Sequence, residues 1–274
     1  MPVRVLQRHF RLFLAGPILI LLLATAVLAN LLAPYDPLGI DAGNILQSPS
    51  GTHLLGTDEL GRDILSRLIF GARVSLSVAA AAVVIASLLG VAVGILSSYA
   101  GGHVENLTMR SIDIFVCLPE IFVAIVVMAF MENSLRTLVL TIGLLYFPQF
   151  ARVAYSVAAS LKRKEYVAAA VSLGASPLHI IGRAILPNMA SVIVVQISFT
   201  LSFAMLLEAG LSFLGLGLMP PAPSWGQMVG TLKDYLFTNA WPVVFPALAL
   251  FLSIFAINTL GDWLQDHLNP EVPR

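Results

Sequence analysis

The chain alternates long apolar stretches with shorter polar ones, and the apolar stretches have the length that crosses a bilayer. Six of them stand out, at about 12–32, 75–97, 112–131, 137–157, 190–213 and 241–263. A helix needs about 20 predominantly apolar residues to span the hydrocarbon core, because it rises about 1.5 Å per residue. The pattern therefore predicts an all-α integral membrane protein with six transmembrane helices.

Basic residues set the orientation of these spans. With the amino terminus in the cytoplasm, ten Lys and Arg residues fall inside and five outside, which is the asymmetry of the positive-inside rule. Six crossings then bring both termini to the cytoplasm. The first span follows Arg4, Arg8 and Arg11 and resembles a signal peptide, but its apolar run continues to Leu32. That run is longer than a signal h-region, so we expect a retained anchor.

Composition agrees with a membrane protein and excludes several function classes. The 274 residues are 58% hydrophobic and 11% charged, with a mean hydropathy of +0.90. Fifteen basic residues balance fifteen acidic ones, so no basic field exists to hold nucleic acid. The single cysteine, Cys117, excludes an intrachain disulfide framework and cysteine-rich metal clusters. His53, His103 and His179 have no metal-ligand spacing, so no metal site is predicted.

The outer loop between the first two spans carries a regular polar pattern. Leu60, Ile64 and Leu65 recur at helical spacing, with Arg62 and Asp63 among the residues on the opposite side. This pattern predicts a short amphipathic helix along the membrane surface or over a pore mouth, with Thr57 as its N-cap. An interfacial spacer with solvated charges explains the pattern equally well.

The cytoplasmic segment at about 160–189 is predicted as two short helices. The first runs from Leu161 to Ser172 and ends at Gly174, because glycine accepts the left-handed backbone of a helix stop. Ser176 caps the second helix and Pro177 begins it, while Pro187 closes it. The chain contains no G-x-x-x-x-G-K-[ST] sequence, so any use of ATP must belong to another subunit.

A loop rich in glycine and proline follows the fifth span. These residues prevent regular helix beyond Phe213. Irregular backbone at membrane depth occurs only against protein or a watery cavity. The loop is therefore expected to shape the outer end of a pathway.

Taken together, these segments resemble the membrane subunits of type I ABC importers, and in particular the second, C-subunit type of permease of the peptide/nickel/opine group. The resemblance covers nearly the whole chain. It rests on residues 55–63 (LGTDELGRD), residues 211–217 (LSFLGLG) with Pro221 and 224–226 (SWG), and residues 166–170 (YVAAA) with Gly174 and 185–188 (ILPN).

The resemblance implies the type I importer permease fold, with a cytoplasmic loop that docks into a groove of the ATPase. The ATPase-coupling candidates are Glu165, Tyr166, Ala168, Ala169, Ala170, Gly174, Ala175, His179, Leu186 and Pro187. The family usually has glutamate where this chain has Ala168, so that polar contact is either missing or supplied by Glu165. An outer-face motif comprises Gly56, Asp58, Gly61, Arg62, Asp63 and Arg67.

The resemblance also implies a division of the chain and a set of partners. Residues 1–72 form the first transmembrane helix and outer loop, 73–262 the five-helix type-1 core and 263–274 a cytoplasmic tail. The implied partners are a sibling permease, two cytoplasmic ATPase subunits and an extracytoplasmic binding protein, in the lipid of a prokaryotic inner membrane. ATP and Mg would bind the ATPase subunits, and this chain would hold no cofactor and no catalytic residue.

The implied function is import of peptides or similar small polar solutes by alternating access, coupled through the 160–189 segment. The substrate alternative is nickel or an opine-type solute. The class alternative is a stand-alone secondary transporter, which needs no helix-turn-helix directed toward a cytoplasmic motor.

Three carboxylates in or beside the spans are pathway candidates, because a carboxylate at membrane depth needs an interior or aqueous setting. Asp113 has an alternative role in stabilising a helix N-terminus. Glu120 suits a cavity and a structural pairing equally well. Glu208 is expected to tie down the glycine- and proline-rich loop rather than to bind solute.

Overall fold

The computed structural model describes residues 2–268, with side chains at Phe13 and from Ala15 onward. Helices make up its regular structure, and the described part contains no β-sheet. In chain order the helices are α1 (Pro2–Val27), α2 (Ala29–Leu32), α3 (Ile64–Ala100), α4 (Gly102–Cys117), α5 (Glu120–Phe130), α6 (Leu135–Lys162), α7 (Glu165–Ser172), α8 (Pro177–Ile180), the π-helical η1 (Ile181–Ile185), α9 (Leu186–Phe213), α10 (Trp225–Leu232), the 3-10 helix η2 (Lys233–Tyr235) and α11 (Trp241–Leu268).

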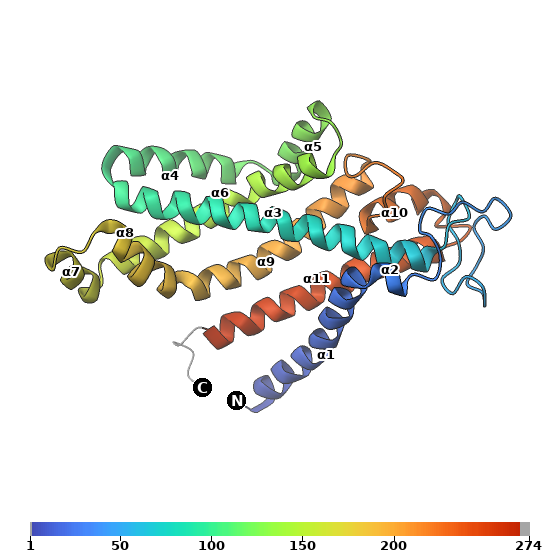
Figure 1. The fold of residues 1–274 in the computed structure, drawn as a ribbon, viewed down its shortest axis with the longest axis horizontal. Helices are drawn as coiled ribbons and strands as arrows, with labels where there is room; N and C mark the ends of the chain where they lie inside the picture. The colour runs from blue at the N-terminus through green and yellow to red at the C-terminus, as the bar shows by residue number, and fades with distance from the viewer. Residues whose placement is uncertain (1, 269–274) are drawn as a thin grey trace.

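The long helices form a bundle along the long axis of the molecule (Figure 1). Four helical runs are long and apolar enough to span a membrane, namely Ile64–Ala100, Leu135–Lys162, Pro177–Phe213 and Trp241–Leu268. The pair α4 and α5 adds a bent fifth, and α1 contributes the apolar stretch Ala15–Val27 and packs against α11. The predicted all-α membrane architecture is confirmed. The side chains of Arg4, Arg8 and Arg11 lie outside the described part of the chain.

The third predicted span is broken rather than continuous. Instead of one helix over 112–131, α4 and α5 meet at an angle of 90°. Leu118 and Pro119 lie between them with extended backbone. Proline has no N–H to donate and disfavours helical backbone at the residue before it, so α4 ends before Pro119 and α5 begins after it.

The most extensive helix–helix contact is between α3 and α6, and small residues allow the approach. A Cβ on Gly90 would collide with Phe150 and with the carbonyl of Phe147. A Cβ on Gly94 would collide with the carbonyl of Ala151. Close backbone approach at small residues is the usual device by which membrane helices associate.

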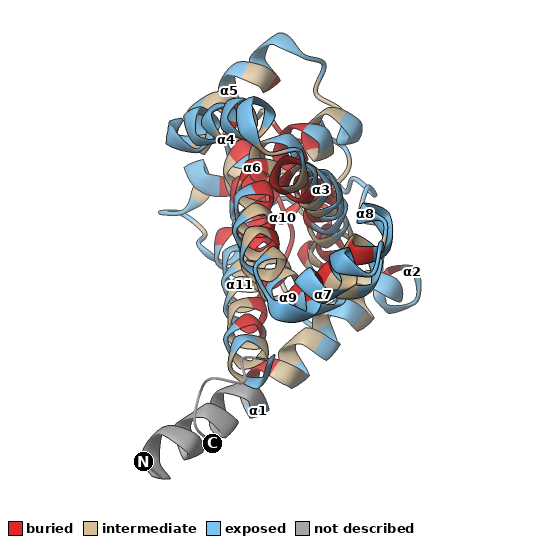
Figure 2. Cartoon of the chain, turned by 90° about the vertical axis from the view of Figure 1, so that its left-hand side faces the viewer, coloured by how far each residue is buried: buried red, intermediate tan, exposed pale blue. Residues whose placement is uncertain are grey.

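Two separate hydrophobic clusters hold the bundle. The larger draws on α3, α5, α6, α9, α10 and α11. The smaller lies at the α7–α8 end and consists of Ile95, Ala154, Ala158, Val167, Ile180, Ile185 and Met189. Figure 2, seen from that end, shows buried residues inside the bundle and exposed ones over α4, α7 and α8.

The predicted amphipathic helix of the outer loop is wrong in its start and its extent. The helix α3 begins at Ile64 and runs through Ala100 without a break. Its N-cap is Asp63, whose side chain accepts from the Ser66 N–H, while Thr57 pairs with Asp63 in an isolated bridge. The apolar spacing marked the first turns of a spanning helix rather than a separate surface helix.

The 160–189 segment follows the prediction in part. Gly174 has φ +80° and lies in the turn that follows α7, as predicted. Ser176 caps α8, and Pro177 lies in the first turn of α8, also as predicted. The first predicted helix is interrupted, because α6 ends at Lys162 and α7 begins at Glu165.

Two further boundaries differ at or near the ends of the later spans. Pro187 does not close a helix. It lies inside the helical run Pro177–Phe213, because η1 leads into α9 without a loop, and the wider π-helical turn of η1 directly precedes this residue that has no N–H to donate. α9 ends at Phe213 as predicted, whereas α11 continues to Leu268, into the predicted tail. Residues 269–274 of that tail lie outside the described residues.

Candidate functional site

The candidate coupling residues lie at one end of the molecule, on α7, α8 and the first turn of α9 (Figure 1). Glu165 begins α7, where a carboxylate is favourable near the positive end of the helix. Ala168, Ala169, Gly174, His179, Leu186 and Pro187 are exposed, and Ala170 and Ala175 are half-buried. Tyr166 is also exposed, together with Val171, Leu173 and Leu178, and Leu173 is 88% exposed. This end of the chain therefore presents an apolar surface to its surroundings.

The turn between α7 and α8 has a defined geometry. The Ala175 N–H donates to the Ala170 carbonyl over 3.0 Å, and the Gly174 N–H donates to the Val171 carbonyl over 2.9 Å. The left-handed backbone of Gly174 makes this closure possible. The turn fixes the direction of α8 relative to α7.

One side chain of α7 anchors it to the bundle. Val167 is only 3% exposed and belongs to the smaller hydrophobic cluster, together with residues of α3, α6, α8, η1 and α9. Val167 lies in the 166–170 motif but is absent from the predicted coupling residues, although an apolar side chain followed by three alanines was a usable signal. Any displacement of α7 must therefore act on the ends of three spanning helices.

Polar contacts strengthen the same end of the bundle. The Lys162 ammonium donates to the carbonyl of Ser98 at the end of α3, and it lies 4.7 Å from the centre of the Tyr99 ring. The Tyr155 hydroxyl donates to Glu105 of α4. Sequence analysis missed these residues, because the partners are 50 or more positions apart and no local pattern relates them.

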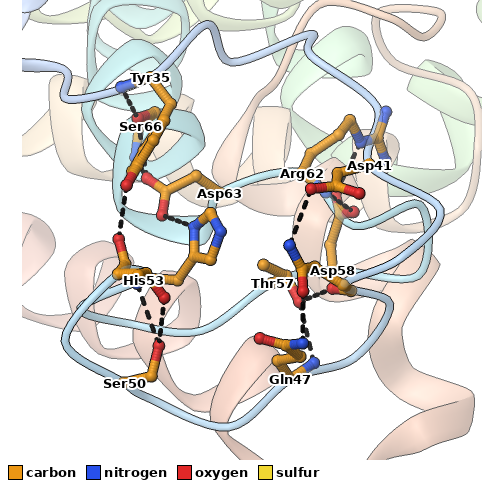
Figure 3. Close-up of polar contacts among 12 residues, drawn as sticks. Tyr35, Asp41, Gln47, Ser50, His53, Thr57, Asp58, Arg62, Asp63 and Ser66 are labelled. Carbon is orange, nitrogen blue, oxygen red and sulfur yellow. Dashed lines mark hydrogen bonds and ion pairs between the residues drawn. The ribbon is translucent and has the colours of Figure 1, made fainter.

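The outer-face motif folds around the carboxylate of Asp58 (Figure 3). Its Oδ1 accepts from the backbone N–H of Arg62 over 2.9 Å and its Oδ2 from Arg62 Nε over 2.7 Å. Arg67 Nε lies 3.2 Å from the same Oδ2, and Arg62 Nη2 also donates to Glu59 over 2.8 Å. Asp58, Arg62 and Arg67 are all buried. The solvated charges of the spacer interpretation are therefore wrong, since these charges form ion pairs with one another inside the loop.

A second polar group lies beside the first and fixes the start of α3 (Figure 3). Asp63 Oδ2 accepts from the N–H and the hydroxyl of Ser66, each over 2.8 Å. His53 Nδ1 lies 3.0 Å from Asp63 Oδ1, and its ring packs against Tyr35 at 4.9 Å between centroids. The Tyr35 N–H donates to the Ser66 hydroxyl, which ties the chain after α2 to α3. His53, Tyr35 and Ser66 were not among the predicted site residues.

Two glycines of the outer-face motif are required by geometry. Gly56 and Gly61 have φ of +81° and +76°. A Cβ on Gly56 would collide with the Gln47 carbonyl, and one on Gly61 with the Asp41 carbonyl. The motif is therefore a folding unit that holds residues 41–63 over the end of the bundle.

The glycine- and proline-rich loop leads into a tightly held helix. Ser224 caps α10 by accepting from the Gln227 N–H. Trp225 is buried, and its indole N–H donates to the Leu68 carbonyl over 3.0 Å. A Cβ on Gly226 would collide with Ala209 of α9. The three residues thus fasten α10 to α3 and α9.

The three candidate carboxylates have different surroundings. Asp113 lies well inside α4 rather than at its start, so the helix-terminus role is wrong, and its Oδ1 is 3.6 Å from Arg152 Nη2. Glu120 lies in the first turn of α5 and accepts from Gln149 Nε2 over 2.7 Å. Glu208 is fully buried and accepts from the Ser212 hydroxyl over 2.8 Å. Of these three residues, only Asp113 and Glu120 are at least partly exposed at the surface of this chain.

Metal-binding side chains do not gather in the described residues. No group of three or more His, Cys, Asp or Glu there has the arrangement to hold a metal ion. The acidic side chains there contact Arg, Asn, Gln, Ser, Tyr, His and backbone donors instead.

Comparison with known proteins identifies the family. Residues 86–274 match the model of the "Binding-protein-dependent transport system inner membrane component" family. The chain is 37% identical over 270 residues to the glutathione transport system permease protein GsiD of Pectobacterium atrosepticum, covering 98% of this chain and 89% of that one. It is 36% identical over 260 residues to the di/tripeptide transport system permease protein DppC of Pseudomonas aeruginosa, covering 93% of this chain and 86% of that one.

A solved structure agrees in fold. The inward-facing MetNI methionine ABC transporter contains a chain that superposes with a TM-score of 0.62 at 18% identity, covering 75% of this chain and 98% of that one. The family match, the relatives that align over nearly the whole chain and the apolar helices agree with one another. The chain therefore belongs to the binding-protein-dependent inner membrane component family, as a multi-pass inner-membrane permease of a type I ABC importer of the peptide group.

Proposed function

We propose that this chain pairs with a sibling permease and forms with it the path for peptides or similar small polar solutes. An extracytoplasmic binding protein delivers the solute, and two cytoplasmic ATPase subunits supply the work. ATP and Mg bind those subunits, and this chain contributes no catalytic residue. The relatives named for glutathione and for di- and tripeptides support a peptide-type solute. Nickel or an opine-type solute is the substrate alternative.

The observation that carries this proposal is the apolar surface at the α7–α8 end. Tyr166, Val171, Leu173 and Leu178 are exposed there, beyond the ends of α3 and α6. Large apolar side chains that gather exposed at one end of the chain, beyond the spanning helices, favour contact with a protein partner. A cytoplasmic ATPase is such a partner, and Glu165 beside Ala168 supplies a polar group at the same surface.

The coupling mechanism follows from how α7 is seated. ATP binding draws the two ATPase subunits together and moves α7 and α8 with them. Val167 and the smaller hydrophobic cluster pass this movement to α3, α6 and α9, and the paired permeases open outward. A binding protein shifts this equilibrium only through different affinities for the two states, so it must prefer the outward form. ATP hydrolysis returns the paired permeases to the state that is open to the cytoplasm.

Purification in mild detergent followed by intact-complex mass spectrometry tests the assembly. The expected result is one copy of this chain with a sibling permease and two ATPase subunits, and ATP-driven uptake after reconstitution with the binding protein. Screening that binding protein against glutathione, dipeptides and Ni²⁺ separates the substrate alternatives. Uptake by this chain alone under a proton or sodium gradient would establish the secondary-transporter alternative instead.

A further inference from the structure

One face of the second half of α6 is polar and open. It carries Gln149, Arg152, Ser156 and Ser160, and Arg163 follows just past the helix end. At about 100° per residue these positions fall within about 80° of one another around the helix axis. Gln149 is half-buried and the others are exposed. We call this face the polar stripe of α6.

The polar stripe begins near the middle of a spanning helix, where exposure of a charged side chain to lipid costs free energy. The helix has 28 residues and is about 42 Å long, with Gln149 at its midpoint. Arg152 lies about 4.5 Å further toward the cytoplasmic end. A charged side chain near the bilayer centre costs about 2.5–3.5 kcal/mol when it faces lipid. The polar stripe therefore faces water or another protein.

The helices α4 and α5 bring further charge to the same place. Asp113 and Arg152 approach to 3.6 Å, yet their side chains stay 54% and 61% exposed, so this chain leaves the pair open. The Glu120 carboxylate contacts Gln149 and lines a cleft at the α4–α5 break with Phe115, Val123, Leu144 and Pro148. No cationic group pairs with Glu120 among the residues that the structure describes.

We propose that the polar stripe of α6, with Asp113 and Glu120, lines the cytoplasmic half of the solute path, and that it serves small zwitterionic solutes. The open carboxylate of Glu120 faces a solute's ammonium group, and Arg152, released from Asp113, faces its carboxylate. This assignment rests on the proposed function, because it needs an assembled path. To the proposed function it adds the face of this chain along which the solute passes.

Cysteine accessibility in the complete complex tests the assignment. The chain has one cysteine, so Cys117→Ala supplies a background for single substitutions. Ser156→Cys and Ser160→Cys report on the polar stripe. Leu96→Cys is the matched control, because Leu96 is 62% exposed on α3 near the level at which Gly94 meets Ala151 and Tyr155 of α6.

Inside-out vesicles containing the complete complex are treated with a charged, membrane-impermeant methanethiosulfonate reagent. Without nucleotide, both stripe variants are expected to react at least tenfold faster than Leu96→Cys, and ATP with vanadate slows them. Equal rates at stripe and control positions would overturn the assignment, and so would stripe positions that do not react because the sibling covers them. ATP-driven uptake by the same vesicles is measured separately. A wrong assignment of the polar stripe can therefore be distinguished from a wrong assignment of the importer function.

Discussion

Val167→Ala is expected to uncouple ATP hydrolysis from transport. The change removes two methyl groups from a side chain that is 3% exposed in the smaller cluster. At about 0.8 kcal/mol per buried carbon, with a further contribution from the cavity, the packing of α7 against the bundle loses about 2 kcal/mol of stabilising free energy. Since 1.4 kcal/mol corresponds to a tenfold change, the seated state becomes about thirtyfold less favoured relative to a displaced one.

The assay measures solute uptake and ATP hydrolysis on the same proteoliposomes with binding protein. Val167→Ala should keep hydrolysis and lower the number of solutes moved per ATP. Val104→Ala is the matched control, because it makes the same change at a side chain that is also 58% exposed, on α4 and outside the surface proposed to bind the ATPase. If Val167→Ala and Val104→Ala give the same uptake per ATP, the cluster does not transmit the movement of α7.

Three further predictions follow from single contacts. Gly174→Ala forces a side chain onto a backbone with φ +80°, which costs about 1–2 kcal/mol. Gly182→Ala is the control, because a Cβ there meets open space and the backbone does not have a positive φ. Only Gly174→Ala should lower coupled uptake. Asp58→Ala removes the carboxylate partner of the buried Arg67 and leaves the buried Arg62 with Glu59 alone, so we expect a loss of about 3–5 kcal/mol, seen as faster trypsin cleavage of the outer loop; unchanged cleavage would mean the charges are not buried. Lys162→Met removes the donor to Ser98 and should lower the midpoint of thermal unfolding, while Lys164→Met at an exposed position should not; equal shifts would refute the contact.

The sequence was sufficient for four of the six predicted spans, because apolar length is a local property. The stop at Gly174, the cap at Ser176 and the end of α9 at Phe213 were equally local, and the structure has all three. The errors came where one residue changes the meaning of a pattern. Pro119 bends a run that otherwise reads as a single span, whereas the helical run Pro177–Phe213 continues through Pro187.

Tertiary contacts account for what sequence analysis missed in the candidate sites. The motif 55–63 read as a polar surface, since nothing local shows that Arg67 turns back to Asp58 and that both are buried. The pairing of Glu120 with Gln149 joins positions 29 apart on two helices, and it depends on the bend at Pro119. Such contacts become visible only once the helices are packed.

The existence of two hydrophobic clusters, rather than one, has a consequence for how such importers diversify. The α7–α8 end has its own interior, which is largely separate from the interior of the larger cluster. Under the proposed function, we therefore expect the choice of ATPase and the choice of solute to change independently of each other. A graft of residues 160–189 from a relative with a different ATPase should accordingly retain solute choice and transfer motor preference.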